Sequence, residues 1–195
     1  MSITKEQNDA AGELVELIAS KIGDSNREIH PETAISSSAR LAGSLLLRSF
    51  DLDLNVGEPG SVLLSEEANE QGPMLINILG GFLSASNIQI DKEKIGGNEN
   101  QRGEAPRLTT IESLSLLQNE ALSICKHNSL SMHSSAQAAA LATAFVVKEC
   151  SPQIGAETAF NVAIFGFIEG SKTIPPAISF KASGKNGKKP WYKIW

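Results

Sequence analysis

The stretch SSSARLAGSLLLR, residues 36–48, carries the residue types best suited to holding an anion. At the helical angle of about 100° per residue, Ser37, Arg40, Ser44 and Arg48 fall along one side of a helix. Two guanidinium groups two turns apart, with hydroxyl groups between them, could clamp a carboxylate or a phosphate. The alternative is that each arginine pairs with a carboxylate of the protein, which the 22 acidic residues favour. We expect internal ion pairs and keep the anion site as the second interpretation.

The segment CKHNSLSMH, residues 125–133, offers the side chains that most resemble metal ligands. Cys125, His127 and His133 are the candidates, with Met132 as a weaker one. On a helix, His127 points about 200° away from Cys125, so the two cannot share a metal ion unless the helix ends before them. Spacings such as CxxC or HExxH are missing from the chain. A buried cysteine and a surface histidine are favoured, and we predict neither a metal nor a cofactor.

Nucleophilic catalysis has no local motif in this sequence. The chain has no GxSxG elbow and no GxGxxG or GxxxxGKS/T phosphate loop. His30, His127 and His133 could each act as a base for one of the many serines, but spacing alone does not establish such a geometry. We therefore expect that this protein is not an enzyme, with an enzyme as the alternative.

The C-terminus, GKNGKKPWYKIW, gathers both tryptophans and the single tyrosine of the chain. Asn186-Gly187 is the favoured central pair of a hairpin turn, and a ribbon folded there places apolar residues on one face. We predict a C-terminal β-ribbon or arm from residue 172 to 195 that contacts a partner surface. Three surfaces remain open: the helices of the same chain, a second copy or another protein, and an anionic membrane or nucleic acid. The predicted contact residues are Ile178, Phe180, Trp191, Tyr192 and Trp195.

Charge is distributed unevenly along the 195 residues. The net charge is −5, but six of the 17 basic residues are lysines that lie after position 171. Glu169 is the last acidic residue of the sequence. The first 171 residues therefore carry 11 basic against 22 acidic side chains. Because phosphate contacts need a positive surface, nucleic-acid binding by this acidic body is disfavoured.

Apolar periodicity and end signals predict about six helices. Two capping boxes, Thr4 with Gln7 and Thr109 with Glu112, start the first and fourth. Gly23 should end the first, Ser65 should cap the third, and Gly72-Pro73 should kink or restart the third. The expected ranges are 4–23, 31–50, 65–86, 109–128, 134–149 and 152–170, the last capped by Ser151 with Pro152 in its first turn. Strand-like pieces are expected at DLDLNV (51–56), NIQID and AISFK.

The fold expected from these elements is a mainly α single domain, a compact bundle with short β pieces. Two three-helix halves, about 1–90 and 108–171, are joined by the polar loop 91–107 and could represent a duplicated unit. The fifth and sixth helices are apolar nearly all round, so we expect them at the centre, and their many Ala and Gly residues predict closely approaching helix pairs.

The functional expectation follows from these exclusions. The longest apolar stretches fall short of the roughly 18 residues of a membrane span, the N-terminus MSITKEQNDA lacks an apolar leader, and only two cysteines occur. We expect a cytoplasmic helical binding or interaction protein that forms a homodimer or contacts another protein. The alternative is an enzyme, or a small-molecule or anion binder, with an Arg- and His-lined pocket between helices. A pocket with converging polar groups would favour this alternative.

Overall fold

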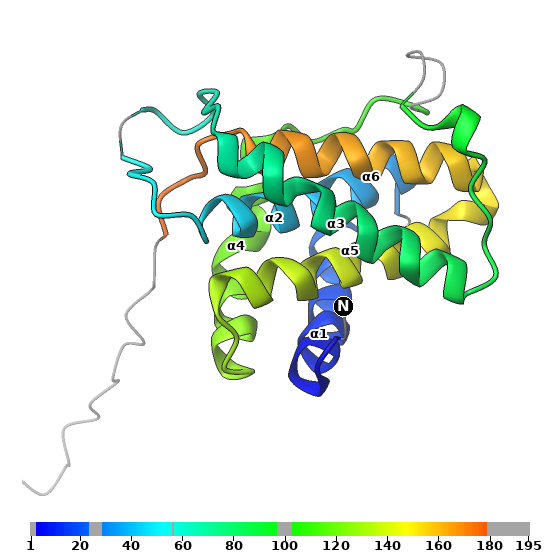
Figure 1. The fold of residues 1–195 in the computed structure, drawn as a ribbon, viewed down its shortest axis with the longest axis horizontal. Coiled ribbons are helices and arrows are strands. Elements are labelled where there is room, and N and C mark those ends of the chain that lie inside the picture. Colours follow the sequence, from blue (N-terminus) through cyan, green and yellow to red (C-terminus); the bar gives the residue numbers. More distant parts are fainter. Residues whose placement is uncertain (1–2, 24–28, 56, 97–102, 179–195) are drawn as a thin grey trace, which may run out of the picture.

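The computed structural model describes residues 3–23, 29–55, 57–96 and 103–178, and in these ranges the protein is mainly α-helical (Figure 1). This confirms the predicted fold class. The helices are α1 (Lys5–Ile22), α2 (Pro31–Leu47), α3 (Glu66–Ala85), α4 (Thr110–His127), α5 (Met132–Ile154) and α6 (Ala156–Ser171), with the 3-10 turn η1 (Lys92–Lys94) between α3 and α4. None of the described helices combines enough length with enough apolar character to cross a lipid bilayer by itself.

The predicted helix ends depend on local hydrogen bonds that the structure contains. Both capping boxes are formed, because the Thr4 and Thr109 side chains each accept from the backbone N–H three residues on, and the Gln7 and Glu112 side chains return the bond. Gly23 ends α1, and the Ser65 hydroxyl accepts from the Ala68 N–H at 3.1 Å to start α3. The predicted starts and stops of these helices are confirmed. They could be predicted from sequence because each depends on neighbours within four residues.

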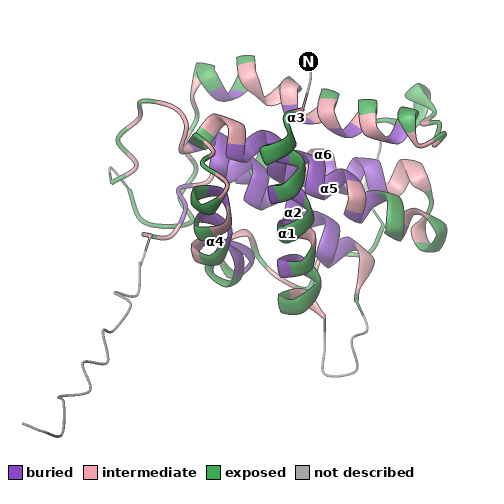
Figure 2. Ribbon diagram, turned by 90° about the horizontal axis from the view of Figure 1, so that it is seen from below, coloured by how far each residue is buried: buried purple, intermediate pink, exposed green. Residues whose placement is uncertain are grey.

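Helix α2 is the most enclosed element of the fold. Every one of its residues after Pro31 is buried, and its main neighbours are α6 and α5, with α4, α1 and α3 also in contact. The buried residues visible in Figure 2 concentrate on α2, α5 and α6. The predicted central position of the fifth and sixth helices agrees with this. The serines of α2 did not indicate its burial from sequence. All four are buried, and the Ser36 and Ser38 hydroxyl groups donate to the carbonyl oxygens of Thr33 and Ile35.

Glycines allow α2 and α6 to touch along their backbones. A Cβ atom at Gly170 would lie 2.1 Å from the Arg40 carbonyl oxygen, and one at Gly43 would lie 2.4 Å from the Phe167 carbonyl oxygen. At Gly166 it would lie 2.6 Å from the Ala39 Cβ atom. The expected close helix pair therefore exists, and α2 is the partner of α6 in it. Any larger residue at these positions would push the two helices apart.

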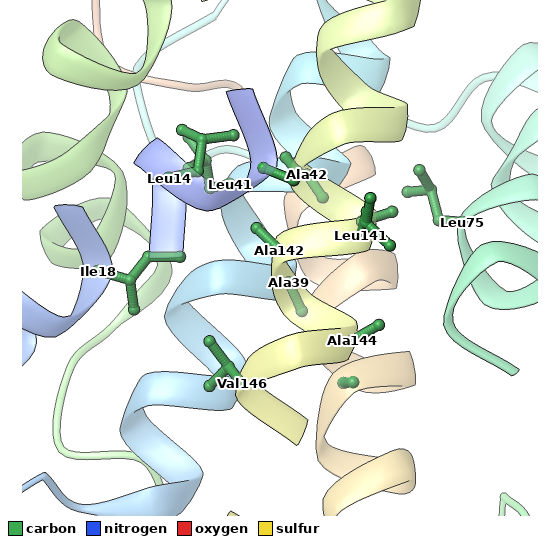
Figure 3. Packing of buried hydrophobic residues seen from close by; sticks show 14 of the residues in the cluster. Leu14, Ile18, Ala39, Leu41, Ala42, Leu75, Leu141, Ala142, Ala144 and Val146 are labelled. Atoms are coloured by element: carbon green, nitrogen blue, oxygen red, sulfur yellow. The ribbon is translucent and has the colours of Figure 1, made fainter. Parts of the chain in front are cut away.

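The hydrophobic core is built mainly from small and branched side chains around α5 (Figure 3). Ala39 and Ala42 of α2 face Ala142 and Leu141 of α5, while Leu14 and Ile18 reach in from α1 and Leu75 from α3. The most extensive packing thus joins helices of one predicted half to helices of the other. The two halves are interleaved in space.

The boundary between α5 and α6 differs from the prediction. Helix α5 continues through Pro152 and ends at Ile154. Gly155 separates it from α6, with a φ of 86° that is costly for residues with a Cβ atom. The Ser151 hydroxyl donates to the Val147 carbonyl oxygen at 2.6 Å instead of capping α6. Pro152 has no N–H to donate to the carbonyl oxygen four residues before it, so α5 loses one backbone hydrogen bond in its last turn. Likewise, α3 runs without interruption past Pro73, so the predicted restart is wrong.

The predicted short strands are not formed in the described residues. Residues 51–55 make bends and turns, and residues 88–90 also lie outside any strand. Leu52 and Leu54 are nevertheless more buried than Asp51, Asp53 and Asn55. The alternating pattern therefore indicated which side chains are buried, but it did not indicate strand pairing. An isolated antiparallel bridge between Val62 and Thr173 is the β pairing present in this part of the chain. The predicted C-terminal ribbon, from Ser179 onward, lies outside the described residues.

Candidate functional site

A pocket of about 320 Å³ opens between α2, α6 and the segment 103–106. Its polar side chains are Ser36 and Arg40 from α2, Glu169 from α6 and Glu104 from the segment. Val162, Phe165 and Pro106 contribute apolar surface. The volume falls within the range of roughly 300–1,000 Å³ found for small-molecule sites.

Arg40 is the central group of this pocket. It is 6% exposed, and its Nε donates to Glu169 Oε2 at 2.6 Å. Its Nη1 donates to the Leu108 carbonyl oxygen at 2.6 Å and to Ser113 Oγ at 3.4 Å. Within the described ranges, nothing accepts a hydrogen bond from Nη2. A buried N–H donor without an acceptor costs about 1–3 kcal/mol, so an acceptor from water or a ligand is expected there.

The contact of α2 with α6 sets the position of Arg40. Gly166 and Gly170 bring the α6 backbone against that of α2 at Ser36 and Arg40. Glu169 precedes Gly170 in the sequence, so its carboxylate lies next to this helix contact. There it accepts a hydrogen bond from the Arg40 guanidinium group. The carboxylate is 46% exposed, whereas the arginine side chain is 8% exposed. The ion pair therefore joins the buried floor of the pocket to its solvent side.

The segment 103–106 is held over the pocket by the first turn of α2. His30 caps α2, with Nδ1 accepting from the Thr33 backbone N–H at 3.3 Å, which leaves the proton of the neutral ring on Nε2. Nε2 then faces Glu104 Oε2 at 3.2 Å and Glu32 Oε2 at 3.6 Å. The buried Glu32 carboxylate also accepts from the Glu104 backbone N–H at 3.0 Å.

Glycine is required at the start of this segment. Gly103 has a φ of 71°, and a Cβ atom there would lie 2.6 Å from Glu32 Oε1. The Arg107 backbone N–H, at the far end of the segment, donates to Thr33 Oγ1 at 2.9 Å. Backbone contacts at both ends thus fix the wall that places Glu104 at the pocket.

Of the four residues of the predicted anion clamp, Arg40 lines the pocket, whereas Ser37, Ser44 and Arg48 do not. Arg40 pairs with a carboxylate, as the favoured interpretation expected. Ser37 is fully buried and bonds to Ser113 Oγ at 3.0 Å, and Ser44 is also buried. Arg48 donates from Nη2 to the Pro176 carbonyl oxygen at 2.7 Å and to Gln118 Oε1 at 3.0 Å, so its partners are neutral. Burial lowers the pKa of Arg48 below its ordinary value.

The candidate metal ligands differ in their surroundings. Cys125 is a buried core residue, and burial, as the largest effect, raises the pKa of its thiol. His127 is exposed at the end of α4, and His133 is half-buried in the first turn of α5. Among the residues that the structure describes, no group of three or more His, Cys, Asp or Glu side chains is arranged to hold a metal ion.

Of the predicted partner-contact residues, Ile178 alone is described. It is half-buried and packs against the hydrophobic core. Phe180, Trp191, Tyr192 and Trp195 lie outside the described residues.

Sequence reasoning missed Ser36, Glu104 and Glu169 as pocket residues. The signal for Glu169 was present in GFIEG, residues 166–170, where two glycines four residues apart mark a close helix contact and enclose a single carboxylate. No comparable local signal marked Glu104, because its place depends on residues more than 70 positions away. No protein-family model, curated protein or solved structure matches this chain.

Proposed function

We propose that this protein binds a small polar molecule carrying both a carboxylate and an amino group in the pocket between α2 and α6. The observation that carries the proposal is Arg40, a largely buried residue of the pocket lining whose Nη2 has no acceptor in the described part of the chain. A ligand carboxylate would supply that acceptor and form a charge-assisted hydrogen bond.

The carboxylates of the pocket explain why an amino group is included. Glu169 already neutralises Arg40, and Glu104 adds a further negative charge to the lining. A simple anion would meet this excess of negative charge, whereas a zwitterion satisfies both signs. Val162 and Phe165 offer apolar contacts to the rest of the molecule. At about 30 Å³ for each water in the liquid, the pocket volume corresponds to about ten waters, which suits a ligand of amino-acid size.

Binding is favoured over catalysis by the state of the nearby reactive groups. The Ser36 hydroxyl donates to the Thr33 carbonyl oxygen at 3.2 Å, so it is engaged within its own helix. His30 uses Nδ1 to cap α2 and Nε2 to hold Glu104. The described residues therefore do not combine a free nucleophile with a base at the pocket.

Calorimetric titration of the full chain with three matched probes tests this function. L-leucine carries both charges, 4-methylpentanoate lacks the amino group, and 3-methylbutylamine lacks the carboxylate. We expect L-leucine to bind at least about tenfold more tightly than either partial probe, a difference of about 1.4 kcal/mol. If 4-methylpentanoate bound as tightly as L-leucine, the pocket would be a simple anion site. Absence of binding by all three would contradict the proposal.

Arg40→Lys and Arg48→Lys form a matched pair of variants for the same titration. Both arginines are largely enclosed and donate to backbone carbonyl oxygens, but only Arg40 lines the pocket. Arg40→Lys should weaken binding of L-leucine at least about tenfold, because lysine lacks the forked donor geometry. Arg48→Lys should leave the affinity unchanged. An equal loss in both variants would show that the effect is structural.

A second candidate function is protein interaction, including self-association as a homodimer. It is favoured by Val62 and Leu64, which are 73% and 74% exposed on the segment before α3. Sedimentation velocity over a hundredfold range of protein concentration tests self-association. A monomer throughout that range would count against a homodimer.

A further inference from the structure

An apolar groove of about 730 Å³ lies between α3 and α5, apart from the pocket at Arg40. Its lining includes Met74, Ile78 and Phe82 of α3, Leu141 of α5 and Ile3 before α1. Phe82 also contacts Phe145 of α5, with ring centroids 4.4 Å apart and ring planes tilted by 54°. The groove therefore offers several large apolar side chains on one surface.

Helix α3 is the least buried of the long helices, although its second half, MLINILGGFL, is almost entirely apolar. Only Ala68, Leu75, Leu79 and Leu83 are buried in it. Figure 2 shows α3 as an outer layer, with half-buried and exposed residues along it. An apolar face left in this position is typical of a docking surface.

Carboxylates precede the groove residues along α3. Glu66, Glu67 and Glu70 are exposed, and α3 contains no lysine or arginine. At about 100° per residue, Glu67 and Glu70 project on the same side of α3 as Met74 and Ile78, and Glu66 lies about 80° from Met74. The occupant that fits this surface is therefore a segment with bulky apolar side chains next to basic ones.

Residues 179–195 of this chain have that composition. They contain four aromatic residues and five lysines, and no acidic residue. The described chain ends at Ile178, which is packed against the core, so the remaining 17 residues start from the body of the protein. At about 3.3–3.6 Å per extended residue they reach about 55–60 Å. A compact domain of this size has a radius of gyration of about 16 Å, so the groove is within reach.

We propose that residues 179–195 occupy the α3–α5 groove of their own chain, with tryptophan side chains on the apolar lining and lysines facing Glu66, Glu67 and Glu70. Apolar burial would hold the segment, and the opposite charges would orient it. This inference is independent of the ligand proposed for the Arg40 pocket, because the two sites share no lining residue.

Tryptophan fluorescence of the full chain tests the proposal, since both tryptophans belong to the segment. In the wild type we expect a blue-shifted emission that does not change on dilution and is protected from acrylamide quenching. The reference for a solvent-exposed ring is N-acetyltryptophanamide in the same buffer. An emission as red as this reference at every protein concentration would overturn the proposal.

Two glycine substitutions on α3 provide a groove variant and a matched control. A Cβ atom at Gly81 or at Gly72 meets no atom within 4 Å, so α3 should fold with leucine at either position. Gly81 lines the groove, whereas Gly72 projects about 180° away. Gly81→Leu should fill the groove, shift the emission to the red and raise the quenching constant severalfold. Gly72→Leu should leave both unchanged.

Three results would overturn this assignment. An unchanged blue emission in Gly81→Leu would place the tryptophans on another surface. Equal red shifts in both variants would show that the groove is not the cause. A blue emission that turns red on dilution, together with a dimer that dissociates in sedimentation, would place the segment on a second copy of the chain.

Discussion

Arg40 and Glu169 are 129 positions apart in the sequence, yet the Nε and Oε2 atoms of their ion pair lie 2.6 Å apart. The pair joins α2 to α6 beside their close contact, and it involves a largely buried arginine that also lines the pocket. The same geometry therefore supports the helix packing and the proposed ligand site.

Glu169→Gln should destabilise the protein moderately. The substitution leaves the buried Arg40 cation without its carboxylate, but half of the Glu169 side chain is in water. We expect a loss of roughly 1–2 kcal/mol in the free energy of unfolding, less than the 3–5 kcal/mol of a fully buried pair. Urea unfolding measures it, with Glu16→Gln on the exposed face of α1 as the control. A loss no larger than that of the control would contradict the role of this ion pair.

Gly170→Ala should be among the most destabilising single substitutions in the chain. Its Cβ atom would lie 2.1 Å from the Arg40 carbonyl oxygen, and neither backbone can move aside alone. We expect a loss of about 3 kcal/mol, at the upper end of the range for overpacking. Gly12→Ala, on the open side of α1, should instead stabilise by about 0.5–1 kcal/mol because alanine is the better helix former. Thermal unfolding of the two variants gives the comparison, and equal effects would refute the predicted close contact.

Ser113 and Ser37 should respond differently to replacement by alanine. The Ser113 hydroxyl donates to the Thr109 carbonyl oxygen at 2.8 Å, so it accepts from Ser37 and from Arg40 Nη1. Ser113→Ala removes an acceptor from two buried donors, and we expect a loss of roughly 2 kcal/mol. Ser37→Ala removes one donor, and we expect less than about 1 kcal/mol. Chemical unfolding in urea measures both, and the reverse order would show that the assigned donor directions are wrong.

Cys150 should make the protein less stable in alkali. Burial, aided by the Glu32 and Glu149 carboxylates, raises the pKa of its thiol from 9.0 to about 11. Above the lower value the unfolded thiol loses its proton while the folded thiol keeps it, so the unfolded state binds fewer protons. The protonated Cys150 thiol therefore contributes fully to the free energy of unfolding below pH 9.0, and this contribution is lost progressively up to about pH 11.

The difference between the wild type and Cys150→Ala isolates this effect from other groups that titrate at high pH. We expect the decline in the free energy of unfolding between these pH values to be smaller in the variant. The native thiol should also react slowly with iodoacetamide at pH 8, since the thiolate is the nucleophile. Parallel stability profiles for the two proteins would contradict the raised pKa.

The sequence by itself determined the features that depend on near neighbours. The capping boxes at Thr4 and Thr109, the cap at Ser65 and the stop at Gly23 each involve residues within four positions, so their hydrogen bonds can be anticipated from spacing. The mainly helical class follows from apolar periodicity. The closely approaching backbones follow from the many small residues, because glycine has no Cβ atom to keep two helices apart.

Tertiary structure alone decided the central position of α2 and where the polar groups meet. Helix α2 carries four serines and an arginine, so its composition resembles an amphipathic helix with one exposed side. Its burial is stable because partners far away in the sequence satisfy those groups, as Glu169 and Leu108 do for Arg40. The pocket needs the first turn of α2 to hold Glu104 from 74 positions away. Such contacts depend on the packing of whole helices, which local spacing does not encode.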